Sequence, residues 1–207
     1  MDSKTYIKNA IRTESIVPLP KVDNTFTFDA VLECFIASAQ LLDMYKKNIY
    51  YGKPIDASKW GETTARLTRE ARTAYRQMPY DTQEHPLYVD SRILHAIIGI
   101  ATESGELMEA IHESFITGKH DKINLQEEVG DLNWYQALLI DALDADWDEI
   151  RERNIAKLKA RYPDKFDSDK AINRNTEIER KILEGETIPG YAGDPGDMDF
   201  GGSDFQA

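Results

Sequence analysis

The apolar residues of this chain recur at helical spacing through most of its length. Five long segments carry this pattern and a shorter sixth follows them: about 28–51, 57–77, 90–116, 124–143, 146–162 and 169–183. Glycine or proline follows most of these segments, as expected at the ends of helices. No segment alternates apolar and polar residues over the length of a strand. The pattern therefore predicts an all-α fold, a helical bundle.

The two ends of the chain lack this pattern. The first 25 residues are weakly patterned and include Pro18 and Pro20. Residues 185–207 hold five acidic residues, six of the twelve glycines, and no Lys or Arg. Such a segment has too few aliphatic side chains to offset the entropy lost on ordering. We therefore predict an N-terminal segment (1–25), a helical domain (26–184) and a mobile acidic tail (185–207).

Composition narrows the class of protein. The 207 residues include 37 Asp or Glu and 25 Lys or Arg, which gives a net charge of −12. This acidity disfavours binding of nucleic acid, although a small anionic substrate remains compatible where a divalent cation mediates. The single cysteine, Cys34, excludes an internal disulfide framework and a cysteine-built zinc site.

Apolar runs are short throughout the chain. The longest, Ile93–Ala101, is too short to cross a bilayer. The first residues, Met1–Tyr6, carry no apolar signal segment. We therefore expect a cytoplasmic protein without membrane contact.

Two pairs of carboxylates, each three residues apart, are the first candidates for chemistry. Glu103 and Glu106 belong to the third predicted helix, and Glu128 and Asp131 belong to the fourth. At about 100° per residue, the first pair lies on the polar face of its helix. A solvated stripe explains that pair as well as a binding site does.

The second pair lies inside an apolar arc formed by the leucines of the fourth helix. Two buried, unpaired carboxylates cost several kcal/mol or take up protons. Because no Lys or Arg occurs between Asp131 and Arg151, the helix has no partner for them. Carboxylate oxygens are the ligands that Mg²⁺ prefers, so we expect a bound cation. The alternative is a salt bridge from Glu128 or Asp131 to an arginine of another helix.

The fifth predicted helix offers groups that suit an anionic substrate. Asn154 falls within its buried stripe, and Lys157 and Arg161 flank that stripe at helical spacing. An amide with two cations would suit phosphate oxygens. On spacing alone, a packed asparagine with solvated basic residues is an equal alternative.

Aromatic residues lie close to the acidic motifs in the sequence. Trp134 and Tyr135 would stack on a nucleobase or, as is more frequent, pack in the core or against another subunit. His95 shares the face of Glu103 but lies more than two helical turns away. We therefore interpret His95 as a packing or outer-shell residue and not as a ligand.

Together these motifs resemble the signature of the MazG-like superfamily of all-α nucleoside triphosphate pyrophosphohydrolases. Glu-x-x-Glu is followed, after 21 residues, by Glu-x-x-Asp. The surrounding motifs agree: Leu94-His95-Ala96, residues 101–106, residues 127–132, Trp134-Tyr135, the Asn154-x-x-Lys157-x-x-x-Arg161-Tyr162-Pro163 stretch and Ile172-Asn173-Arg174. The resemblance covers roughly residues 90–183 and is nearest to the phage and bacterial MazG-like proteins.

The resemblance implies an activity and a site. The activity is Mg²⁺-dependent cleavage of an NTP or dNTP between the α and β phosphates, with Mn²⁺ as a substitute metal and pyrophosphate as a product. The implied metal ligands and catalytic residues are Glu103, Glu106, Glu128 and Asp131. The substrate-binding candidates are Asn154, Lys157, Arg161, Lys119 and Trp134. The resemblance also implies a homodimer or homotetramer that completes the helical bundle.

One part of the family pattern is displaced in this chain. Relatives often follow the first acidic pair with Leu-Asp-x-x-Lys-Lys-x-x-Tyr-Gly-Lys-Pro-x-Asp, whereas residues 108–119, ending in Lys119, match this weakly. A better copy, with Lys46, Lys47 and Lys53, lies at 42–56. Residues 28–77 are therefore either a degenerate duplicated half without ligands, or two helices with a similar Gly-Lys end. The substrate-binding basic residues would then be either Lys119 or the set Lys46, Lys47 and Lys53.

Two other functions remain open from the sequence. The first is hydrolysis of a non-standard or alarmone nucleotide by the same site. The second is a non-catalytic helical protein whose carboxylates bind a structural cation or the basic residues of a partner. Retention of all four carboxylates favours an enzyme over this last interpretation.

Overall fold

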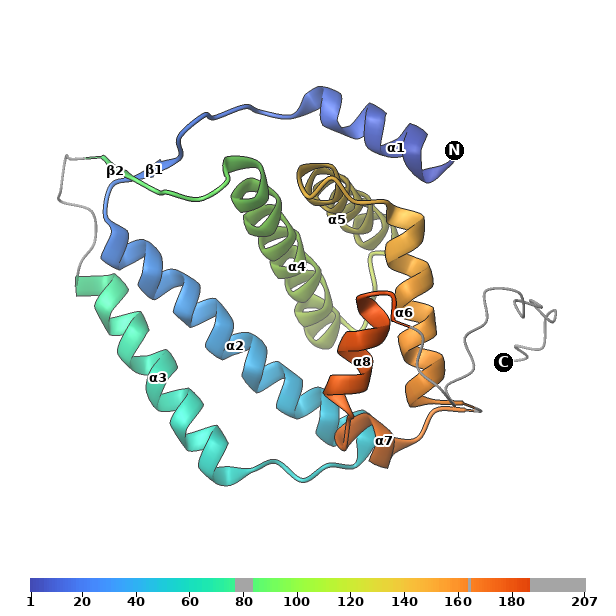
Figure 1. Cartoon of the computed structure of the whole chain (residues 1–207). Helices are drawn as coiled ribbons and strands as arrows, with labels where there is room; N and C mark the ends of the chain where they lie inside the picture. The colour runs from blue at the N-terminus through green and yellow to red at the C-terminus, as the bar shows by residue number, and fades with distance from the viewer. Residues whose placement is uncertain (77–83, 164, 187–207) are drawn as a thin grey trace. The chain divides into compact units, whose positions relative to one another are not determined.

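The computed structural model describes residues 1–76, 84–163 and 165–186 of the chain (Figure 1). The elements are α1 (Ser3–Ala10), a 3-10 turn η1 (Ile11–Thr13), β1 (Lys21–Val22), α2 (Thr25–Tyr51), α3 (Ala57–Arg76), β2 (His85–Pro86), α4 (Ser91–Thr117), α5 (Lys122–Ala142), α6 (Trp147–Arg161), α7 (Ser168–Ile172) and α8 (Thr176–Leu183). The two short strands pair antiparallel. The all-α prediction is confirmed. Most of the predicted acidic tail, 187–207, lies outside the described residues.

The chain divides into two compact units. The first unit is Met1–Asp43 with Asp56–Asp148, and the second is Met44–Ile55 with the residues from Glu149 onward. The first unit therefore contains α1, most of α2, and all of α3, α4 and α5. The second contains the end of α2, most of α6, and α7 and α8.

Helices α4 and α5 form an antiparallel hairpin with extensive contact between them. Asp90 caps α4 by accepting hydrogen bonds from two backbone N–H groups of its first turn. Gly118 ends α4 in the left-handed conformation, with φ of 69°, which glycine adopts without steric cost. Asp121 then caps α5 in the same way as Asp90 caps α4. The short connection brings the two acidic motifs onto neighbouring helices.

A close approach between α4 and α5 depends on Gly99. A Cβ atom at Gly99 would lie 2.1 Å from ring carbons of Tyr135 on α5. Such a distance is far below van der Waals contact, so the absence of a side chain at Gly99 lets the Tyr135 ring lie against the α4 backbone. The close contact fixes where the Tyr135 side chain sits along α4.

The N-terminal segment contains a helix where the sequence predicts no element. Helix α1 packs on α5 and on the start of α6, in a cluster of buried or half-buried residues: Tyr6, Ile7, Ala10, Trp134, Ala137, Ile140 and Trp147. The indole N–H of Trp134 donates to the Ala10 carbonyl at 2.9 Å. Arg92 bonds Glu14 at 2.7 and 2.9 Å and Asp141 at 2.6 Å. These tertiary contacts stabilise an eight-residue helix that is too short to show a clear periodicity.

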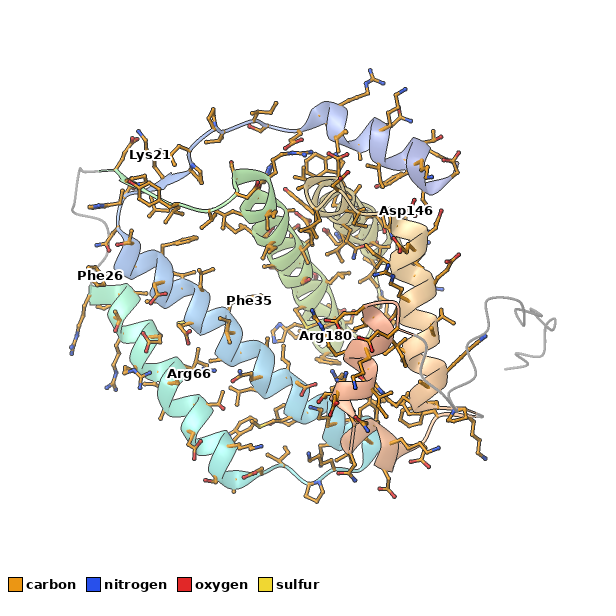
Figure 2. The ribbon with its side chains drawn as sticks, in the orientation of Figure 1. Lys21, Phe26, Phe35, Arg66, Asp146 and Arg180 are labelled. Carbon is orange, nitrogen blue, oxygen red and sulfur yellow. The ribbon has the colours of Figure 1, made fainter. Side chains whose placement is uncertain are left out.

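Helices α2 and α3 repeat the dimensions of the α4–α5 hairpin. Both α2 and α4 have 27 residues, and each bound of α4 follows the corresponding bound of α2 by 66 residues. Gly52 and Gly118, also 66 residues apart, have φ of 67° and 69°. Arg66 of α3 is turned toward α2, where its Nη2 donates to Gln40 (Figure 2). The two pairs differ in packing, because α2 and α3 are in far less contact with each other than α4 and α5 are. The duplication of residues 28–77 therefore stays a prediction.

The second unit differs from the prediction at its C-terminal end. One helix over about 169–183 is predicted, but the structure has α7 and α8 with a break at residues 173–175. Asn175 caps α8 by accepting a hydrogen bond from the Ile178 backbone N–H. Within α8, Glu179 is buried and accepts hydrogen bonds from Arg161 and Arg174. The cap and this ion-pair cluster explain the break.

Of the described helices, α2 alone is long and apolar enough, by length and composition, to span a membrane. The sequence prediction rests on the longest apolar run, Ile93–Ala101, which His95 and Gly99 interrupt, whereas α2 reaches its mean hydropathy with more polar residues interspersed. One such helix is weak evidence for a membrane, because core helices of soluble proteins pass the same test.

Candidate active site

Three of the four predicted carboxylates converge on the α4–α5 hairpin. Glu103 and Glu106 of α4 and Glu128 of α5 each have a carboxylate oxygen within 4.8 Å of the other two. Glu128 is buried, with 5% of its surface exposed, whereas Glu103 is half-buried and Glu106 is exposed. The three residues (the carboxylate cluster) therefore line a site that is closed on the α5 side and open on the side of Glu106.

The electrostatics of the cluster favour a bound cation. Burial raises the pKa of Glu103, and the negative charges of Glu106, Asp131 and Glu128 raise it further. The neighbouring carboxylates therefore disfavour the ionised form of Glu103. A divalent cation would remove this repulsion, and a set of carboxylate oxygens suits the hard cations Mg²⁺ and Mn²⁺.

Asp131 lies outside the 4.8 Å cluster, although its charge acts on Glu103. The sequence predicts that both Glu128 and Asp131 are buried. This is confirmed for Glu128 and is wrong for Asp131, which is exposed. Its carboxylate is therefore open to solvent beside the cluster.

The alternative of an interhelical salt bridge does not hold for these residues. Among the described residues, no Lys or Arg pairs with Glu103, Glu106, Glu128 or Asp131. The cluster's polar neighbour is instead Asn124, whose Nδ2 donates to Glu128 Oε1 at 2.6 Å. Because an amide carries no charge, this bond orients Glu128 and leaves its negative charge available.

Asn124 is a functional candidate that the sequence reasoning missed. It lies four residues before Glu128 in α5, a spacing at which side chains on a helix meet. An amide that fixes a carboxylate beside a cation site acts as an outer-shell support. The signal in the sequence is the Asn-x-x-x-Glu spacing.

Three aromatic rings form a layer next to the cluster. His95 contacts Trp134 and Tyr135 edge to face, with centroid distances of 6.0 and 5.6 Å, and Trp134 contacts Tyr135 at 4.9 Å. The indole N–H of Trp134 is bonded to the N-terminal segment at Ala10 and Thr13. These contacts give Trp134 and His95 packing roles in the first unit.

Tyr135 connects this layer to the carboxylates. Burial raises its pKa, and the charges of Glu103, Asp131 and Glu106 raise it further. The Tyr135 hydroxyl therefore lies in the electric field of the acidic residues, while its ring packs on Gly99.

The predicted substrate-binding residues lie in several places. Lys119 is exposed and follows the end of α4. The end of α4 is itself about 16 Å along the helix from Glu106. Asn154 and Lys157 belong to α6 in the second unit, and Asn154 is exposed and not in a buried stripe as the sequence predicts. Arg161 makes two hydrogen bonds to Glu179, at 2.8 and 2.7 Å. Substrate binding by these residues stays a prediction.

Comparison with known proteins gives a match in the part of the chain that contains the carboxylate cluster. Residues 93–166 match the family model of the MazG nucleotide pyrophosphohydrolase domain. The match includes the carboxylate cluster, Asp131 and Asn154, and it leaves out α1, α2 and α3. No curated protein and no solved structure matches the chain.

The similarity to the MazG nucleotide pyrophosphohydrolase domain therefore holds for residues 93–166 of the chain. The family of this domain generally depends on divalent cations. The four carboxylates of the resemblance lie within this domain, on the two helices of one hairpin.

Proposed function

We propose that this protein is a Mg²⁺-dependent nucleoside triphosphate pyrophosphohydrolase that cleaves an NTP or dNTP between the α and β phosphates. The products are the nucleoside monophosphate and pyrophosphate. The observation that carries the proposal is the carboxylate cluster, which has no basic partner among the described residues and lies inside a MazG domain. Mn²⁺ is expected to substitute for Mg²⁺, because both are bound by carboxylate oxygens.

Each carboxylate has a role in this proposal. Glu103, Glu106 and Glu128 would hold the cation, with Asp131 as a further ligand implied by the family. When bound, the cation would lower the pKa of a coordinated water and neutralise charge on the phosphates. Asn124 keeps Glu128 oriented through its hydrogen bond. Because Asp131 lies beside the cluster and outside the group of three converging carboxylates, it is the carboxylate best suited to accept a proton from the attacking water.

The substrate polyphosphate also needs groups that donate hydrogen bonds. We propose Asn154 and Lys157 for this role, as the resemblance implies, with Lys119 and Arg161 as further candidates. Arg161 would first have to leave Glu179, which makes Lys157 the stronger candidate. A cytoplasmic enzyme acting on free nucleotides, without nucleic acid or membrane, agrees with the net charge of −12.

The first test is release of pyrophosphate from a panel of NTPs and dNTPs, with and without Mg²⁺. Non-standard nucleotides and an alarmone belong in the panel, because the same site would serve that alternative. We expect E128Q and D131N to reduce turnover to background, because each removes a negative charge at the cation site. Cation-free E128Q should unfold at a higher temperature than the wild type, because repulsion with Glu103 is removed.

The matched control is E109Q, which removes an exposed carboxylate of α4 outside the cluster. It should keep normal turnover. Near-normal turnover of E128Q or D131N would show that the ligand assignment is wrong. No turnover of any nucleotide at micromolar enzyme would refute the enzymatic proposal as a whole.

We also propose that the protein is a homodimer or homotetramer. Helix α2 exposes a row of large apolar side chains in the first unit: Val31, Leu32, Phe35, Ile36 and Leu42. Exposed apolar surface of this extent is typical of an interface between subunits. Figure 2 marks Phe35, which is 48% exposed, within this row.

A further inference from the structure

A pocket of about 290 Å³ lies in the second unit, lined by residues from the end of α6, from α7 and α8, and from the turn between α7 and α8. Its volume is at the lower end of those of small-molecule sites in proteins. The pocket shares no residue with the carboxylate cluster, which belongs to the first unit. The polar residues that line it are Arg161, Lys170, Asn173, Arg174, Asn175 and Glu179.

Positive charge is in excess in this lining. Three of its residues are cationic and one is anionic, which gives a formal charge of +2 in a chain whose net charge is −12. The single carboxylate, Glu179, pairs with both Arg161 and Arg174 and cannot neutralise the two together. Lys170 has no ion pair among the described residues. The pocket therefore attracts an anion.

The Glu179 carboxylate is covered by the two guanidinium groups and does not repel such an anion strongly. Its side chain is 7% exposed. Its oxygens accept hydrogen bonds from Arg161 Nε and Nη2 at 2.8 and 2.7 Å, from Arg174 Nε at 3.4 Å, and from Arg174 Nη2. A carboxylate has about four acceptor positions, so these bonds use its capacity. Glu179 therefore holds both arginines in place.

Hydrogen-bond donors remain in the lining after these bonds are made. A guanidinium has five N–H donors, and the N–H groups of Arg174 that do not bond Glu179 have no partner among the described residues. Asn175 Oδ1 accepts from the Ile178 backbone N–H at 3.2 Å, which leaves the Asn175 side-chain NH₂ as a donor. Lys170 adds an ammonium group. The pocket therefore suits a ligand with several acceptor atoms.

Phosphate oxygens match this combination of charge and donors. A guanidinium binds phosphate through parallel N–H bonds, and an ammonium binds it as a point charge. We propose that this pocket binds a small oxyanion of the phosphate class, held by Arg174, Lys170 and Asn175. Arg161 keeps its bonds to Glu179. Because cations and an amide supply the contacts, binding needs no metal, and the inference does not depend on the proposed function.

The test is calorimetric titration of pyrophosphate into the full-length protein, in buffer freed of divalent cations. Pyrophosphate is a phosphate-class anion that the carboxylate cluster would repel in the absence of a cation. We expect one pyrophosphate to bind per chain. In K170Q the dissociation constant should rise about tenfold, the effect of one lost hydrogen bond between charged groups. Because Lys170 is exposed, the unfolding temperature of K170Q should equal that of the wild type.

The matched control is K159Q, which removes an exposed lysine of α6 that does not line the pocket. It should bind pyrophosphate as the wild type does. The inference is overturned if the wild type binds no pyrophosphate or if K170Q binds it with wild-type affinity. Equal losses in K170Q and K159Q would also overturn it, because the attraction would then be that of general surface charge.

A second titration separates two sources of the anion. The probe is α,β-methylene ATP in the same buffer. Weaker binding of this probe by K170Q than by K159Q would show that the pocket accepts the phosphates of a nucleotide. Binding of pyrophosphate alone would show that it accepts the free anion. Pyrophosphate binding by a protein that turns over no nucleotide would support this inference and refute the proposed function.

Discussion

The pKa of Glu103 is raised in the folded chain by burial and by the neighbouring carboxylates. The folded state therefore binds the Glu103 proton more tightly than the unfolded state does. Without a cation, this contribution to stability is lost as pH rises from the ordinary value of 4.5 through the raised pKa. Saturating Mg²⁺ should reverse this trend, because it binds the ionised cluster of the folded state.

The variant E103Q tests this residue-scale prediction. In a chelator, thermal unfolding of E103Q should occur at a higher temperature than that of the wild type at pH 7. The difference should vanish near pH 4, where Glu103 is protonated in both states. E109Q is again the control, and the prediction fails if E109Q behaves as E103Q does.

The sequence predicts which residues form the carboxylate cluster better than it predicts how buried each of them is. Spacing alone brings Glu103 and Glu106, or Glu128 and Asp131, to one face of a helix, so the two pairs were recognisable. Burial depends on the tertiary contacts of α5, which a helical wheel does not contain. For this reason the predicted burial of Asp131 is wrong. The contact of Asn124 with Glu128 is local, and its spacing was present in the sequence.

Helices were predicted where their ends carry strong local signals. Asp90, Gly118 and Asp121 mark the bounds of the α4–α5 hairpin through caps and a left-handed glycine, which act within one turn. Helix α1 has no comparable length, and its stability comes from contacts with residues more than a hundred positions away. The break between α7 and α8 likewise depends on Glu179 and its two arginines.

The Glu179 cluster shows how ion pairs stabilise a short element. Burial alone would raise the pKa of Glu179, but hydrogen bonds from Arg174 and Arg161 outweigh it and lower the pKa to about 2. Glu179 therefore stabilises the second unit above the ordinary pKa of 4.5, and the contribution is lost as pH falls toward 2. This cluster lies in an element that the sequence predicts as one uninterrupted helix.

At the scale of elements, the α4–α5 contact makes a prediction at Gly99. Alanine in a helix interior is about 1 kcal/mol more favourable than glycine. At Gly99 the added methyl would overlap the Tyr135 ring, and overpacking of this kind costs about 1–3 kcal/mol or more. We therefore expect G99A to lower the free energy of unfolding measured in urea, because the overlap outweighs the gain in propensity.

Gly105 is a matched control on the same helix. A Cβ atom there would meet nothing within 4 Å. Only the propensity gain applies, so G105A should be more stable than the wild type by up to about 1 kcal/mol. Stabilisation by both substitutions would show that Tyr135 moves freely and that the α4–α5 distance is not set by Gly99.

Helices α2 and α3 lack the acidic motifs of the α4–α5 hairpin. At the 66-residue offset, Ala37 and Gln40 of α2 take the places of Glu103 and Glu106. Arg66 of α3 donates to Gln40 and pairs with Glu33 at 3.6 Å. A guanidinium therefore lies between α2 and α3, where the α4–α5 hairpin has its carboxylates. The duplication of residues 28–77 stays a prediction.

At the scale of the whole molecule, the charge of −12 and the apolar surface of α2 serve different purposes. Four carboxylates of that charge belong to the proposed cation site, so a loaded enzyme is less acidic than its sequence. The remaining acidic surface keeps separate molecules apart unless apolar contacts outweigh the repulsion. Helix α2 offers such contacts, and they predict association through this face.

Replacing Phe35 with lysine tests this association. A lysine in the centre of an apolar interface leaves a charge without a partner, so F35K should shift the molar mass toward a single chain in light scattering after size exclusion. Y75K, which introduces the same charge at an exposed aromatic residue of α3, should keep the wild-type mass. A wild type that is monomeric at micromolar concentration would contradict the proposal. If F35K becomes monomeric and also loses turnover, the active site depends on the partner subunit. Unchanged turnover in a monomeric F35K would show that it does not.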